Sequence, residues 1–89
     1  MTVRLRVVVD GFVQGVGFRA STRAHASSLG LAGWVANRGD GSVEAVFEGD
    51  RDRVESMLDW CGRGPAGSRV DEVEASWEEP RGETGFHVR

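Results

Sequence analysis

The pattern of apolar positions divides the first third of the chain into a strand and a helix. Residues Arg4 to Val9 alternate between polar and apolar and then become continuously apolar, which predicts a half-buried strand. From residue 18, one helical face is marked by four residues three or four positions apart: Phe18, Thr22, Ala26 and Leu29. Gly30 follows them and is expected to end the helix.

The middle of the chain has the pattern of a β-hairpin. Leu31 to Val35 predicts one strand, and Ser42 to Glu48 predicts another, with Val43, Ala45 and Phe47 on one face. Between them Asp40-Gly41 is a strong hairpin-turn signal. We therefore expect the two strands to pair, with Asp40 shaping the turn.

The last part of the chain predicts a second helix and two further strands. Asp50 is expected to cap the helix, whose apolar stripe contains Val54, Met57, Leu58 and Cys61. A loop from Gly62 to Ser68 follows. Val73, Ala75 and Trp77 alternate with polar residues in a strand that faces solvent on one side, and residues Thr84 to Val88 form a short last strand.

The predicted order of elements, β-α-β-β-α-β with a short extra strand, is the ferredoxin-like arrangement of the α+β class. We expect a sandwich of an antiparallel four-stranded sheet, extended by the C-terminal strand, and two helices on one face. A chain of 89 residues provides one core, so residues 1–89 are expected to form a single domain. This fold serves many functions, so the function must be argued from a site.

The strongest candidate site is the loop Gln14-Gly15-Val16-Gly17-Phe18-Arg19. It follows a predicted strand and leads into a predicted helix, an arrangement that directs several backbone N–H groups to one point where an anion can bind. Arg19 adds a planar set of donors that fits phosphate oxygens. The sequence therefore predicts a site for a phosphate-sized anion.

Charge and composition narrow the possible chemistry. Residues 1–38 contain five arginines and one acid, whereas residues 39–89 contain six arginines and thirteen acids, for a net charge of −3. The basic first part suits an anionic ligand, and the acidic remainder argues against broad nucleic-acid binding. The chain contains no lysine, which excludes a Walker-type phosphate loop and a lysine Schiff base.

Cysteine and histidine offer no alternative site. A cysteine phosphatase has the pattern C-x5-R, but the sixth residue after Cys61 is Gly67. His25 and His87 have no metal-ligand partners nearby in the sequence, so no metal is expected. The single cysteine fits a reducing compartment, and no apolar run is long enough to cross a membrane. We expect a cytoplasmic protein that does not bind membranes.

Two stretches of the chain together resemble the signatures of the acylphosphatase family. Residues Gly11 to Arg19 resemble G-x-V-Q-G-V-x-F-R, and residues Gly33 to Val43 resemble G-W-V-x-N-x-x-D-G-x-V. Leu29-Gly30-Leu31 and Gly64-Pro65 add to the resemblance, which extends over essentially the whole chain. After Arg19 the chain has Ala20 and Ser21 where many relatives have bulkier residues, which would widen the mouth of the site.

The resemblance implies metal-free hydrolysis of acyl phosphates to a carboxylate and inorganic phosphate, without a cofactor. Arg19 would hold the phosphoryl group and Asn37 would orient the attacking water. The phosphate-binding residues would be Gln14, Gly15, Val16, Gly17, Phe18 and Arg19, with Gln14 supporting the loop. The partners would be a small acyl phosphate as substrate and inorganic phosphate or similar anions as product or inhibitor. We expect a monomer.

Two alternatives remain at this stage. The first is a non-catalytic, phosphate-binding module on the same fold. The second is an RNA-binding module, which shares the topology but has aromatic residues on its sheet in a K/R-G-F/Y pattern that this chain lacks. We expect Phe18 and Trp34 to belong to the core.

Overall fold

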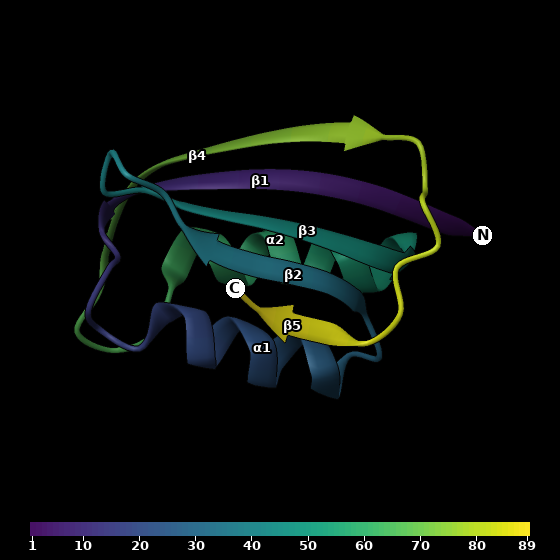
Figure 1. Cartoon of the computed structure of the whole chain (residues 1–89), viewed down its shortest axis with the longest axis horizontal. Coiled ribbons are helices and arrows are strands. Elements are labelled where there is room, and N and C mark those ends of the chain that lie inside the picture. The colour runs from purple at the N-terminus through teal and green to yellow at the C-terminus, as the bar shows by residue number, and fades with distance from the viewer.

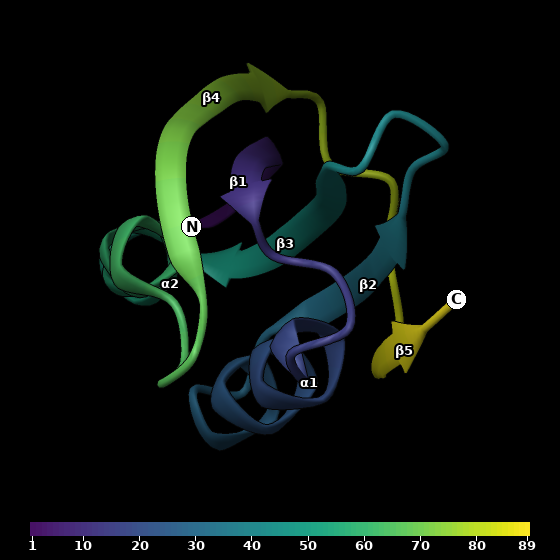
Figure 2. The ribbon, with the colours of Figure 1, turned by 90° about the vertical axis from the view of Figure 1, so that its left-hand side faces the viewer.

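The computed structural model describes residues 1–89 and contains five strands and two helices (Figure 1). In chain order these are β1 (Thr2–Phe12), α1 (Phe18–Ser28), β2 (Ala32–Asn37), β3 (Val43–Asp50), α2 (Arg51–Arg63), β4 (Arg69–Glu78) and β5 (Phe86–Val88). The strands lie in the order β4-β1-β3-β2-β5. All neighbouring strands are antiparallel except β2 and β5, which are parallel. Both helices cover one face of the sheet (Figure 2), so the predicted ferredoxin-like α+β sandwich is confirmed.

Several elements are longer or shorter than the sequence pattern indicates. The strand β1 has eleven residues because β3 and β4 pair with it on both sides, well beyond the predicted Arg4 to Val9. The helix α1 ends at Ser28, and Gly30 follows with a φ of 68°, a left-handed conformation that suits glycine. Asp50 occupies the predicted N-cap of α2, but its side chain makes no capping hydrogen bond.

Neither helix has the length and apolar character of a segment that spans a membrane.

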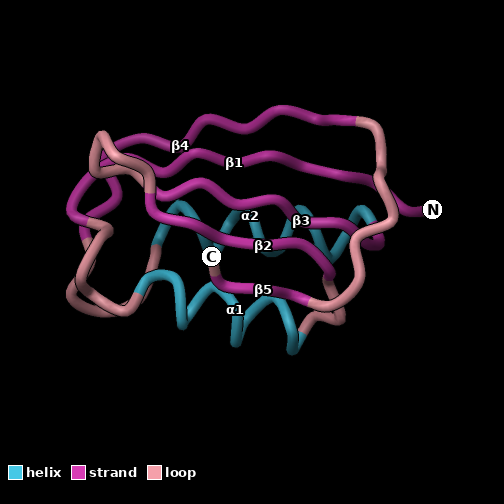
Figure 3. The backbone as a smooth tube through the Cα atoms, viewed as in Figure 1, coloured by secondary structure: helices cyan, strands magenta, loops and turns pink.

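The core lies between the strands and the helices, which are magenta and cyan in Figure 3. Alternate residues of the strands meet the apolar faces of α1 and α2 there. Leu5, Val7 and Val9 of β1 are at most 1% exposed. Since successive residues of a strand point to opposite faces, the residues between them lie on the other face of the sheet, which no helix covers. We call this the open face.

The prediction that Phe18 and Trp34 belong to the core is confirmed for Phe18 and wrong for Trp34. Phe18 is 2% exposed and packs near Trp60 of α2. Trp34 stands between Gly33 and Val35, which are buried on the helix side, so strand alternation places its ring on the open face. There it is half-buried, and the Arg89 guanidinium lies 4.3 Å from its ring centroid.

The open face carries a buried cluster of charges centred on Arg4, which is only 3% exposed. Its guanidinium donates to Glu48 at 2.7 Å, to Glu83 at 2.9 Å and to Glu78 at 3.0 Å. The Glu48 carboxylate also accepts three backbone N–H groups, those of residues 81, 82 and 83. These bonds tie the segment between β4 and β5 to the middle of the sheet and thereby fix where β5 lies.

The Arg4 cluster changes the interpretation of the charge distribution. Arg4 is paired with three glutamates, and Arg6 forms a salt bridge with Glu44. Two of the five arginines in the basic first part of the chain are therefore neutralised on the open face.

The surroundings of Glu48 lower its pKa. Burial alone would raise the pKa of this carboxyl, but the backbone N–H of Arg81, the Arg4 guanidinium and the backbone N–H of Glu83 stabilise the charged form and prevail. Because the pKa of Glu48 is lower in the folded than in the unfolded chain, the charged carboxylate stabilises the fold above pH 4.5, its ordinary pKa. That stabilisation is lost as the pH falls through the lower, folded-state pKa.

We predict that Glu48→Gln lowers the free energy of unfolding at pH 7 by about 3 kcal/mol, since it leaves the buried Arg4 with an incomplete set of anions. Urea unfolding measures the change. The matched control is Glu55→Gln, which removes an exposed ion pair with Arg51 and is expected to cost less than about 1 kcal/mol. The difference between wild type and Glu48→Gln should shrink below pH 4.5. Equal effects of the two substitutions would contradict the role of the cluster.

Candidate functional site

The turn between β1 and α1 presents free backbone donors at its surface. Gly15 and Gly17 have φ values of 75° and 76°, in the left-handed region that glycine adopts without strain. Gly17 is the N-cap of α1, no side chain caps the helix, and its first turn contains no acidic residue. The first helical bond runs from the N–H of Ser21 to the carbonyl of Gly17. The preceding N–H groups therefore have no helical partner and favour an anion.

A pocket of about 210 Å³ lies against this turn. Its lining residues come from the turn, from the first residues of α1, from the end of β2 and from β5: Val13, Gly15, Gly17, Phe18, Arg19, Ala20, Asn37 and Val88. Five of the residues predicted from the sequence therefore line one pocket. Gln14 and Val16 are not among the lining residues.

Asn37 lines the pocket because successive side chains of β2 point to opposite faces of the sheet. It is the last residue of the strand, pairs with Val43, and shares the helix side of the sheet with Val35. Because it ends the strand, its side chain is exposed instead of covered by α1. This places an amide group opposite the start of α1.

Arg19 is half-buried at the edge of the pocket. One of its terminal nitrogens donates a hydrogen bond to the backbone carbonyl oxygen of Arg89 at 2.9 Å. No side-chain carboxylate forms a salt bridge with Arg19, whereas Arg4 and Arg6 are both paired with glutamates. The guanidinium is thus held in place by a main-chain oxygen, and no side-chain carboxylate pairs with it.

Gln14 connects the turn to the β2–β3 hairpin. Its side-chain nitrogen donates to the carbonyl oxygens of Arg38 and Ser42, each at 2.8 Å. These two residues flank the hairpin turn, where the Asp40 carboxylate accepts hydrogen bonds from the N–H and the hydroxyl of Ser42. Asp40 therefore shapes the turn as predicted, and the Ser42 hydroxyl and N–H lower the pKa of its carboxyl. Gln14 holds the hairpin, and with it Asn37, beside the turn.

The other reactive side chains lie outside the pocket. Cys61 is buried in the core, and burial raises the pKa of its thiol to about 12. His25 stacks on Trp60 with ring centroids 5.1 Å apart. Three carboxylates that could hold a cation, those of Asp10, Glu72 and Glu74, lie close together on β1 and β4, and none of them lines the pocket.

We predict that Gln14→Ala lowers the free energy of unfolding by about 1–2 kcal/mol, because two hydrogen bonds to the hairpin are lost. Gln14→Glu should cost more, since it sets a carboxylate against two carbonyl oxygens. Chemical denaturation of both variants measures their free energies of unfolding and shows which substitution costs more. A Gln14→Glu variant as stable as wild type would show that the side chain does not act as a donor.

Comparison with known proteins identifies the family of this chain. The Acylphosphatase family profile matches residues 5–88. The acylphosphatase of Trichormus variabilis is 56% identical over 87 residues, which cover 98% of this chain and 86% of that protein. The solved acylphosphatase of Coxiella burnetii has a TM-score of 0.96 at 38% identity and covers 99% of this chain and 93% of its own. That of Bacillus subtilis has a TM-score of 0.95 at 36% identity, with 100% and 99% coverage. The chain therefore belongs to the acylphosphatase family, whose enzymes hydrolyse acyl phosphates.

Proposed function

We propose that the pocket at the start of α1 hydrolyses small acyl phosphates, with Arg19 and backbone N–H groups binding the phosphoryl group and Asn37 orienting the attacking water. The observation that supports this most strongly is that Arg19, Asn37 and the glycine turn, which come from separate parts of the chain, line the same pocket. In this proposal Gln14 positions the hairpin, and the backbone N–H groups of residues 15–18, that of Val16 included, bind the phosphoryl oxygens.

Phosphoryl transfer requires mainly positioning and stabilisation of charge, and this pocket provides both. The N–H groups at the start of α1 and the guanidinium of Arg19 are donors that need no rearrangement to receive phosphoryl oxygens. Arg19 has five N–H donors, and its bond to the Arg89 carbonyl uses one of them. The remaining donors are available as negative charge develops on the phosphoryl oxygens.

Asn37 suits the water because an amide both accepts and donates a hydrogen bond but does not act as a base. The oxygen of the water forms a bond to phosphorus while the bond from phosphorus to the acyl oxygen breaks. The leaving group departs as a carboxylate, a weak base that requires no general acid. One proton of the water passes to a phosphate oxygen of the substrate itself, and the other stays on the new hydroxyl group of the inorganic phosphate.

We further propose that the reaction needs no metal ion. The pocket lining contains no histidine, cysteine, aspartate or glutamate, the side chains that usually bind metals in proteins, and its charged group is an arginine. Such a set of donors favours an anion over a cation.

The cellular setting is part of the same proposal. The single cysteine is free and buried, which fits a reducing compartment such as the cytoplasm. Four large apolar side chains are exposed, at the N-terminus, the end of β1, β4 and β5, and they do not suggest one apolar interface: Met1, Phe12, Trp77 and Val88. We therefore propose a monomer.

We predict that Arg19→Ala and Asn37→Ala each lower kcat/KM for acetyl phosphate by about 100-fold or more, or about 3 kcal/mol, as expected for the loss of one preorganised donor. Competitive inhibition by inorganic phosphate separates their roles. Arg19→Ala should weaken the inhibition by phosphate, and Asn37→Ala should leave this inhibition nearly unchanged.

The matched control is Arg23→Ala, one turn along α1 and outside the pocket lining. Full activity of Asn37→Ala would refute its role with water. Phosphate binding by a wild type without turnover would favour the non-catalytic module.

A chelator should leave the activity unchanged. The measurement is acyl phosphate hydrolysis after dialysis against EDTA, with and without added zinc or magnesium. Activity that is lost on dialysis and restored by either ion would contradict the metal-free proposal.

A further inference from the structure

Part of the pocket lining is apolar and has no task in binding the phosphoryl group. It consists of the side chains of Val13, Phe18, Ala20 and Val88. Val13 and Phe18 are 1% and 2% exposed, so they belong to the core and form the floor of the pocket. Ala20 is exposed and Val88 is 39% exposed, so these two reach the surface at the mouth.

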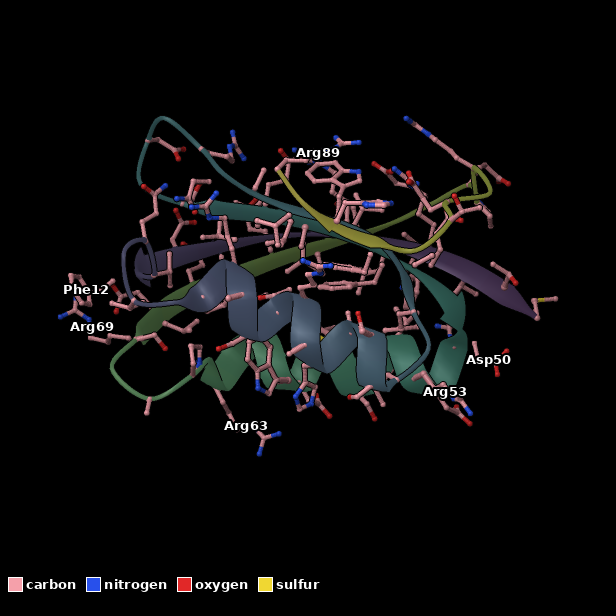
Figure 4. The ribbon with its side chains drawn as sticks, turned by 60° about the horizontal axis from the view of Figure 1, so that its bottom comes forward. Phe12, Asp50, Arg53, Arg63, Arg69 and Arg89 are labelled. Carbon is pink, nitrogen blue, oxygen red and sulfur yellow. The ribbon has the colours of Figure 1, made fainter.

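Ala20 and Val88 meet at the pocket from two different elements. Val88 pairs with Val35, so it points to the helix side of the sheet, toward α1. Ala20 lies in the first turn of α1, directly after Arg19. The strand β5 contacts α1, and Figure 4 shows the end of β5, next to Arg89, above this helix. The two side chains therefore bound the opening beside the guanidinium of Arg19.

The position of Val88 is fixed by bonds on both sides of it. The N–H of Arg89 donates to the carbonyl of Val35 at 2.8 Å, and the N–H of Gly33 donates to the carbonyl of Gly85 at 2.9 Å. The bonds of Glu48 to the segment before β5 add a third anchor. Val88 is thus a fixed wall of the pocket, although it is partly exposed.

We propose that Ala20 and Val88 form the surface on which the acyl group of the substrate lies, and that they set the preference among acyl phosphates. This inference rests on the proposed function. With the phosphoryl group against the turn at Gly15 to Phe18, the acyl group attached to it must extend toward the opening. There it meets a small side chain, Ala20, and a branched apolar one, Val88. This surface favours hydrocarbon acyl groups, such as an aromatic one, over acetyl.

The test compares kcat/KM for benzoyl phosphate and acetyl phosphate in the same protein preparation. The ratio of the two values does not depend on the fraction of folded protein. Wild type should prefer benzoyl phosphate. Val88→Thr, of equal size but more polar, should lower the benzoyl-to-acetyl ratio about fourfold, since one buried CH₂-sized group contributes roughly 0.8 kcal/mol. Ala20→Leu should lower it about tenfold by narrowing the mouth.

Two substitutions outside the pocket serve as controls. Ala24→Leu adds the same bulk one turn further along α1, and Val8→Thr adds the same polarity on the open face. Both should keep the wild-type ratio. Inhibition by inorganic phosphate should be unchanged in all four variants, because phosphate lacks an acyl group.

The outcomes separate this inference from the proposed function. If wild type hydrolyses both substrates and the ratio stays the same in Val88→Thr and Ala20→Leu, the inference is wrong and the proposed function stands. If the two controls shift the ratio as much as the pocket variants, the inference is also wrong. If wild type hydrolyses neither substrate, the proposed function fails and the inference fails with it.

Discussion

The left-handed conformation of Gly15 and Gly17 is the constraint on which the site depends. With φ values of 75° and 76°, these residues turn the chain from the end of β1 into α1 within a few residues. A residue with a side chain would be strained at either position, although there is open space around both. The short turn leaves the first N–H groups of α1 uncapped, close to the end of β1. The anion site is therefore a consequence of how the backbone turns.

Separate interactions hold the other parts of the pocket against this turn. Gln14 binds two carbonyl groups of the β2–β3 hairpin and so positions Asn37. The Arg4 cluster on the open face anchors the segment before β5. The strand β5 carries Val88, and Arg89, directly after it, provides the main-chain oxygen that orients Arg19. A buried charge cluster and a site on opposite faces of the sheet are thus linked through one short strand. Donors held in this way need little rearrangement during a reaction.

The sequence pattern was sufficient for the fold, and it pointed to one part of the candidate site. Periodicity predicted the order of strands and helices because each segment has one buried face, and the spacing of Gly15, Gly17 and Arg19 predicted an anion site. Asn37 was found through resemblance to the acylphosphatase family, since no local pattern distinguishes it from any asparagine before a turn.

Features that depend on distant residues were not predictable. Arg4 has the pattern of a solvent-facing strand residue, and it is buried because three glutamates from distant parts of the chain surround it: Glu48, Glu78 and Glu83. Trp34 was expected in the core because it is large and apolar, yet the alternation of β2 turns it to the open face. Val88 gave no local signal, because its role at the pocket depends on the parallel pairing of β5 with β2.

The central claim is that the glycine turn and Arg19 together form the phosphate site. Titration of ¹⁵N-labelled protein with inorganic phosphate, followed by amide and arginine side-chain NMR, tests it most directly. The largest shifts should occur at the amides of residues 15–19 and at the Arg19 side chain, and they should saturate together with one dissociation constant. Saturable shifts centred elsewhere, for example on the groove that Ser28 and Trp60 line between the helices, with residues 15–19 unaffected, would contradict the account.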